Sequence, residues 1–255
     1  MRPRVLPILC TFLALLLFGC SVLTRARPPV PLATSLQEIV PHADRDHFVY
    51  VWQRFDDGQL VGTGIQVEHV TALGAGEFEV LLSEDGMAVG RTCLRDTGDA
   101  LLLVSEDDLT QGLRLAYDPP LTQLVVPLFA GEQRASASAT MTRLADGQVV
   151  LAFPVEQTTK VGSGHAVGSP LGTFARTVVV QEVRTLQIPD GSTALTTTTV
   201  LVPGIGEISS IGRASGTPPL RRELACAIIG GRRVGDCTHL NQRRDERGAR
   251  SSDVR

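Results

Sequence analysis

The chain has 255 residues, a formal net charge of −3, and 43% hydrophobic and 20% charged residues. This composition is ordinary for a globular chain, and the slight negative charge gives no support for nucleic-acid binding. Aromatic residues make up only 4% of the chain, so we expect a core built mainly from aliphatic side chains.

The first nineteen residues have the layout of an export signal. Two arginines precede an apolar run over residues 5–18, and small Gly19 and then Cys20 follow it. This order of basic start, apolar segment and small residue is typical of secretory signals. The sequence Leu17-Phe18-Gly19-Cys20 resembles the lipobox of bacterial lipoproteins, which implies removal of residues 1–19 and lipidation of Cys20.

A lipidated Cys20 implies a cell-envelope protein held on the membrane by its acyl chains, without a transmembrane helix. Ser21, rather than aspartate, follows this cysteine. In a Gram-negative cell the same resemblance implies the outer membrane, facing the periplasm. Two alternatives remain open: a freely secreted protein, and an uncleaved anchor, because the apolar run counted to Leu23 reaches about 19 residues.

Residues 20–46 are expected to form the lipidated N-terminus and a tether. The stretch 25–31 combines arginines with prolines, which favours an extended chain. Ser35 and Glu38 have the spacing of a capping box and predict one or two helical turns. Pro41 would end that helix at Val40.

Residues 47–240 are expected to form one antiparallel β domain, because hydrophobic residues there recur with period two and Asp-Gly or Gly-Gly turns separate the runs. On the second of these strands, Val61, Ile65, Val67 and Leu73 are expected to share one face, with Gly62 and Gly64 on the other. About a dozen strands must curl, close or cover their apolar face. The predicted fold class is therefore mostly β, a single curved antiparallel meander (half-barrel or open barrel) with one or two short helices.

The middle of this domain departs from the alternating pattern. Residues 105–108 look like a second helix start, with Gly112 as its end. Asp118-Pro119-Pro120 and Pro127 predict the longest irregular stretch of the chain. A domain boundary could lie only here, and a single domain is favoured. Beyond the domain, residues 241–255 are polar, without periodicity, and are expected to be disordered.

Two stretches near the end carry a resemblance to a known family. Residues 196–208 contain the turn Pro203-Gly204-Ile205-Gly206, and residues 220–224 end in Glu223-Leu224. They resemble the closing hairpins of uncharacterised bacterial envelope lipoproteins, whose turn has valine in place of Ile205. Those proteins are similar to the LolA/LolB-like half-barrel β domain, a curved sheet that can hold acyl chains. The resemblance implies a hydrophobic ligand on the concave face of the sheet.

Three cysteines follow Cys20 in the chain: Cys93, Cys226 and Cys237. An exported compartment permits disulfides. A hairpin at Gly230-Gly231 would bring Cys226 and Cys237 into the same neighbourhood and allow them to pair. The alternative is three buried free thiols that pack as small apolar groups.

The sequence contains no recognisable catalytic, cofactor or metal site. None of the five histidines has zinc-ligand spacing, and the acidic run 106–108 lacks calcium-loop spacing. The loop with Ser163 and His165 has no oriented acid for a triad. We therefore expect neither an enzyme nor a cofactor.

Phe48, Tyr50 and Trp52 alternate on one strand and share a face. They are either core residues or candidate ligand-facing residues. Two functional classes remain. One is a membrane-anchored protein that binds a hydrophobic ligand such as an acyl chain or lipid. The other is a structural or accessory lipoprotein that docks other envelope components.

Overall fold

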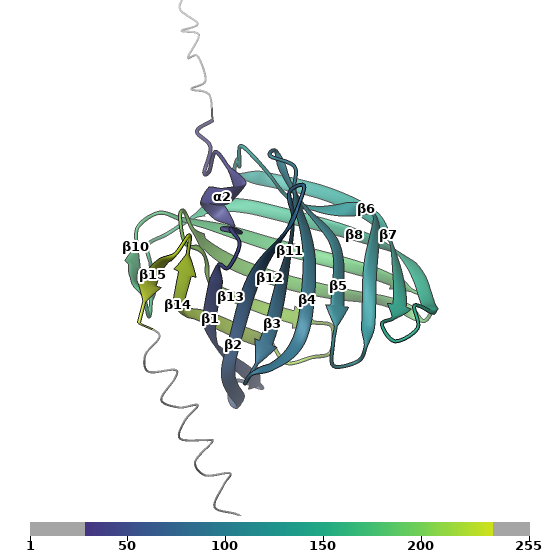
Figure 1. Cartoon of the computed structure of the whole chain (residues 1–255). Helices are drawn as coiled ribbons and strands as arrows, with labels where there is room; N and C mark the ends of the chain where they lie inside the picture. Colours follow the sequence, from purple (N-terminus) through teal and green to yellow (C-terminus); the bar gives the residue numbers. More distant parts are fainter. Residues whose placement is uncertain (1–28, 237–255) are drawn as a thin grey trace, which may run out of the picture. The chain divides into compact units, whose positions relative to one another are not determined.

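The computed structural model describes residues 29–236, and the unit that begins at Pro31 is built around a closed antiparallel sheet (Figure 1). Twelve strands follow one another in chain order around it. These strands are β1 (His47–Asp56), β2 (Gln59–Gly74), β3 (Glu77–Glu84), β4 (Met87–Asp96), β5 (Ala100–Asp108), β6 (Leu113–Val125), β7 (Gly131–Arg143), β8 (Val149–Gly164), β11 (Thr177–Ile188), β12 (Gly191–Val202), β13 (Gly206–Ala214) and β14 (Leu220–Ile229). The predicted β meander is confirmed.

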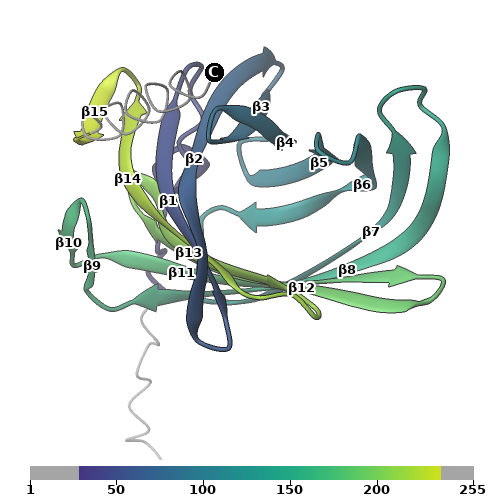
Figure 2. The same ribbon diagram turned by 90° about the horizontal axis from the view of Figure 1, so that it is seen from below.

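The sheet closes because β1 pairs with β2 on one side and with β14 on the other. Tyr50 lies opposite Leu224 and Trp52 lies opposite Arg222 in the closing ladder. The neighbouring β13–β14 ladder is short, from Ser209 opposite Glu223 to Gly212 opposite Leu220. Figure 2 shows the strands arranged around a common interior. Full closure removes the exposed sheet edges that an open meander would leave.

Three short strands lie outside this ring. β15 (Arg232–Gly235) pairs with the end of β14. β9 (Val167–Ser169) and β10 (Gly172–Phe174) form a two-stranded hairpin of their own between β8 and β11. The glycine-rich loop with Ser163 and His165 therefore leads from the end of β8 into this hairpin.

The predicted helix is present as α2 (Leu36–Ile39). The Ser35 hydroxyl accepts a hydrogen bond from the backbone N–H of Glu38, as a capping residue should. Leu36 and Ile39 are buried within the barrel unit. The Gly204 N–H donates to the carbonyl of Glu38, which ties this helix to the β12–β13 turn. Among the described residues, no helix is long and apolar enough to cross a membrane.

The second predicted helix, at residues 105–108, is wrong, because these residues form the end of β5. The acidic side chains that suggested a helix start instead pair across strands. Asp107 bonds Arg91 on β4 and Arg114 on β6. Burial alone would raise the pKa of Asp107, but its hydrogen bonds from Arg114 and Arg91 outweigh burial and hold that pKa below its usual value. Tertiary pairing has overridden a local helix signal.

The predicted irregular stretch around Asp118-Pro119-Pro120 is also wrong, because β6 continues through it. In the β5–β6 ladder, Leu103 lies opposite Leu121 and Ser105 lies opposite Ala116. Residues 117–120 are therefore extra on β6 and form a large bulge. A proline has no N–H to give to a ladder and is tolerated where the pairing is interrupted. β6 therefore continues as one strand, and Pro119 and Pro120 lie in the bulge, where β6 is not paired with β5.

The apolar face that the sequence predicts on β2 points away from the barrel interior. Glu68 and Val70 line an internal cavity, whereas Val61 and Leu73 are 57% and 54% exposed. Ile65 and Val67 lie on the same outward face as Val61 and Leu73, because alternate residues of a strand share a face. Part of this barrel's interior is charged, so apolarity did not identify the inner face of this strand.

Two glycines of β2 explain how the barrel holds its one tryptophan. The Trp52 indole lies over Gly62 and Gly64, and a Cβ at Gly64 would be 2.7 Å from the indole Nε1. The glycines leave the space that the ring fills. The bulge expected at these glycines lies beside Gly62, where the β1–β2 register shifts.

Candidate ligand-binding cavity

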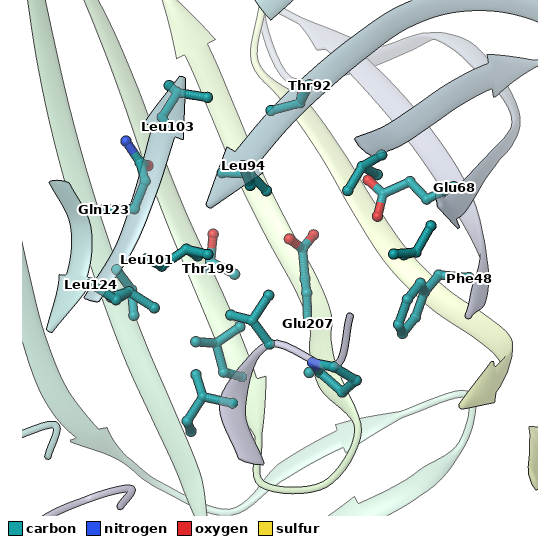
Figure 3. Close-up of a pocket in the computed structure, with 18 of the residues that line it drawn as sticks. Phe48, Glu68, Thr92, Leu94, Leu101, Leu103, Gln123, Leu124, Thr199 and Glu207 are labelled. Atoms are coloured by element: carbon teal, nitrogen blue, oxygen red, sulfur yellow. The ribbon is translucent and has the colours of Figure 1, made fainter. Parts of the chain in front are cut away.

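A cavity of about 330 Å³ lies inside the barrel unit, next to α2. Figure 3 shows Phe48, Glu68 and Glu207 on one side of it and Leu101 and Leu124 on the other. Its apolar lining comes from Ile39, Val40, Pro41, Phe48, Val70, Phe78, Val80, Leu94, Leu101, Leu103, Leu124, Val180 and Leu201. Its polar lining comes from Tyr50, Glu68, Thr92, Glu106, Gln123, Glu182, Arg184, Thr199, Glu207 and Arg222. The site is therefore amphipathic.

Part of the polar lining belongs to the Arg184 cluster, which we define as Arg184, Glu106, Tyr117, Gln157 and Glu182. Of these, Arg184, Glu106 and Glu182 line the cavity. The Arg184 Nη1 donates to Glu106 at 2.7 Å and to the Tyr117 hydroxyl at 3.1 Å. Nη2 donates to Glu182 at 3.0 Å, and Nε donates to Gln157 at 3.2 Å. These residues come from β5, β6, β8 and β11. Arg184 needs these partners because a buried guanidinium is stable only when its charge is paired and hydrogen-bonded.

The electrostatics of the Arg184 cluster favour the charged form of Arg184 and disfavour the charged form of Glu182. Burial opposes the charge of Arg184, but Glu106 and Glu182 outweigh burial and raise its pKa above the usual range. Burial also raises the pKa of Glu182, and the neighbouring charge of Glu106 raises it further, while Arg184 acts in the opposite direction. The negative charge of Glu182 is thus not fully compensated by Arg184.

A second part belongs to the Arg222 cluster, which we define as Arg222, Tyr50, Glu68, Glu207 and Ser210. All of these except Ser210 line the cavity. Arg222 makes a two-point contact with Glu207, at 2.6 Å from Nε and 2.8 Å from Nη2. Its Nη1 donates to Glu68 at 2.5 Å, and its guanidinium lies 4.5 Å from the ring centre of Tyr50. The members come from β13, β14, β1 and β2, the four strands at which the sheet closes.

The sequence-predicted aromatic residues fall in two places. Phe48 and Tyr50 are buried and line the cavity. Trp52 is not among the lining residues, because its ring occupies the space over Gly62 and Gly64. Contact of these residues with a ligand stays a prediction.

The predicted lipidation and disulfide sites lie partly beyond the described residues. Cys20 and Cys237 fall outside residues 29–236, together with the signal (residues 1–19) and the tail (residues 241–255). Cys226 is fully buried on β14, and its pairing with Cys237 stays a prediction. Cys93, on β4, is a free thiol.

The charged lining residues were missed by sequence reasoning. On β11, Glu182 and Arg184 have the same parity as Val178 and Val180, so all four point into the barrel. A charged residue placed on the apolar face of a strand was the available signal, because such residues are almost never fully buried unless they are paired.

Sequence reasoning also missed a pair of histidines. Across the β1–β2 ladder, His47 and His69 lie opposite each other with their Nδ1 atoms 3.0 Å apart. Burial, followed by the charge of His69, lowers the pKa of His47. Glu68, the neighbour of His69, points into the cavity, so these two residues face opposite sides of β2. Within residues 29–236, no group of three or more His, Cys, Asp or Glu side chains is arranged to hold a metal ion.

Comparisons with known proteins found similar solved structures but no relative by sequence. No protein-family model matches the sequence, and no curated protein matches it. A solved structure of a candidate exported protein with a YmcC-like fold from Bacteroides fragilis is similar, with a TM-score of 0.45 and 13% identity over 76% of this chain and 97% of that chain. A candidate lipoprotein from Parabacteroides distasonis has a TM-score of 0.43 and 9% identity over 78% and 98%. At such identities, ligand and function must be argued from this chain's own residues.

Proposed function

We propose that this protein is a lipid-anchored protein of the cell envelope whose barrel binds a hydrophobic ligand, an acyl chain or a lipid, in its internal cavity. The anchor is supported by the lipobox resemblance at residues 17–20. The observation that carries the binding role is the cavity itself. Its volume of about 330 Å³ lies at the lower end of the range of small-molecule sites, and most of its lining is apolar.

The lining also supports a binding role over a catalytic one. Among the described residues that line the cavity, none is a serine, cysteine, lysine or histidine. Its charged side chains are hydrogen-bonded to one another, as in Arg184 with Glu182 and Arg222 with Glu207. A nucleophile beside an oriented base is the arrangement that would indicate covalent catalysis.

Native mass spectrometry of the full-length protein, purified from cells, tests this proposal. We expect a small molecule to co-purify with the wild type and to be lost on unfolding. Thr199→Phe adds bulk to the cavity lining and should lower its occupancy. Thr198→Phe makes the same change on the outer face of β12 and should leave the occupancy unchanged.

Two outcomes would contradict the proposal. A bare polypeptide mass for the wild type would argue against a resident ligand and leave the accessory docking role as the remaining class. Equal occupancy in Thr199→Phe and Thr198→Phe would place the co-purifying molecule outside the cavity. The intact mass of the mature chain also tests the anchor, because acylation at Cys20 adds mass that Cys20→Ser would remove.

A further inference from the structure

The polar half of the cavity has more hydrogen-bond acceptors and negative charges than its own arginines can neutralise. Four glutamates, Glu68, Glu106, Glu182 and Glu207, line it together with two arginines. A ligand that enters this space meets an environment with excess negative charge. The inference that follows rests on the proposed function, because it specifies the head group of the ligand in the same cavity.

Both arginines are already paired with glutamates. Each of the three guanidinium nitrogens of Arg184 contacts an acceptor within its own cluster. The three nitrogens of Arg222 do the same, with Glu207, Glu68 and Ser210. An anionic ligand that approached either arginine would therefore also lie beside two glutamates. Repulsion from these carboxylates opposes its binding.

The carboxylates of the Arg184 cluster, by contrast, retain accepting capacity. Glu106 accepts hydrogen bonds from Tyr117 and Arg184 through Oε2, and Glu182 accepts one from Arg184 through Oε1. Among the described residues, the Oε1 of Glu106 and the Oε2 of Glu182 have no hydrogen-bond donor. The side chain of Glu106 is 38% exposed although it points into the barrel. A carboxylate can accept about four hydrogen bonds, so this pair can receive further donors.

The carboxylates of the Arg222 cluster have less free capacity to accept hydrogen bonds. Both oxygens of Glu207 contact Arg222, and Oε1 of Glu68 does so as well. The side chains of Glu68 and Glu207 are also less exposed than that of Glu106, at 17% and 16%. The open acidic position in the cavity is therefore beside Arg184.

We propose that the ligand is an amphiphile with a cationic amine head group, which lies against Glu106 and Glu182 while its hydrocarbon part packs on the apolar lining of the cavity. The ammonium donates hydrogen bonds to the two unused carboxylate oxygens. Phe48, Phe78 and Leu101 supply apolar contacts on the same cavity. Burial and the neighbouring charge of Glu106 raise the pKa of Glu182, and a cation beside both carboxylates relieves this repulsion. A fatty-acid carboxylate meets the same carboxylates and is disfavoured.

Three ligands of equal chain length, octylamine, octanoate and 1-octanol, distinguish the contribution of the head group to binding from that of the hydrocarbon tail. Each is titrated into the full-length protein in a nonionic detergent, and occupancy is measured by native mass spectrometry. We expect octylamine to bind at least about tenfold more tightly than octanoate, because opposite charges attract strongly where water is scarce. In the double variant Glu106→Gln/Glu182→Gln this ratio should fall toward one.

A matched control removes the same charge elsewhere. Glu132→Gln/Glu156→Gln neutralises two carboxylates on the outer face of β7 and β8, and it should keep the wild-type ratio. If the double cavity variant does not fold, Glu106→Gln alone, which changes the more exposed carboxylate, should still lower the ratio.

The outcomes distinguish this inference from the function on which it rests. If octanoate binds as tightly as octylamine, or if the cavity variants keep the wild-type ratio, the amine head group is wrong although the cavity still binds a hydrophobic ligand. If none of the three compounds binds, the proposed hydrophobic-ligand function is contradicted as well.

Discussion

The two tyrosines of the chain, Tyr50 and Tyr117, each lie beside an internal arginine, and each of those arginines bonds two glutamates. The Arg222 cluster joins β13, β14, β1 and β2, where the sheet closes and the β13–β14 ladder has few residue pairs. Arg184 and Glu182 of the other cluster lie on β11, which pairs along most of its length with β8 and β12. The same residue types therefore link the closing strands in the Arg222 cluster, whereas in the Arg184 cluster they leave carboxylate oxygens free to accept hydrogen bonds.

The largest expected effect comes from removing the arginine at the closure. Arg222→Met leaves Glu68 and Glu207 without their cation inside the barrel, and breaking a buried pair in this way costs about 3–5 kcal/mol. Chemical denaturation should show this loss in the free energy of unfolding. Arg221→Met, which changes an exposed arginine on the outer face of the same strand, should stay within about 0.5 kcal/mol of the wild type.

A loss in Arg222→Met no larger than that in Arg221→Met would show that backbone pairing alone closes the sheet. The interior ion pairs would then have no structural role at this point of the barrel.

The comparison also shows how far the sequence can be interpreted. Period-two patterns and Asp-Gly turns predicted most strands, since both are local signals. Closure was not predictable, because pairing of Tyr50 with Leu224 joins positions far apart in the chain, and a strand's own pattern does not identify its partner.

The candidate site was harder to predict because its charged residues lie on the inner face. A rule that equates apolar with inward would place Val67 inside and Glu68 outside, and the barrel has the opposite arrangement. Only a partner such as Arg222, 154 residues away, makes the inward position of Glu68 stable. That partner is visible only once the fold is known.

A smaller effect is expected from Arg184→Met. This change also strips two carboxylates of their cation, but Glu182 can take up a proton, and β11 remains paired with β8 and β12 on either side. We expect a loss of about 1–3 kcal/mol in the free energy of unfolding at neutral pH, the usual cost of buried groups left unsatisfied. A loss that exceeds that of Arg222→Met would contradict the distinction between the two clusters.

The smallest effect concerns the pH dependence of the Arg184 cluster. Burial and then Glu106 raise the pKa of Glu182 in the folded protein, so the folded state holds this proton more tightly than the unfolded state does. Stability from this group is therefore fully present below the unfolded pKa and is lost as pH rises through the folded pKa. Relative to Glu182→Gln, the wild type should lose unfolding free energy as pH rises above about 4.5, the usual value for a glutamate. Denaturation midpoints measured from pH 4 to pH 8 would show it, with the exposed-site variant Glu156→Gln following the wild type. Parallel curves for the wild type and Glu182→Gln would mean that Arg184 compensates the charge of Glu182 fully, which would contradict the raised pKa of Glu182.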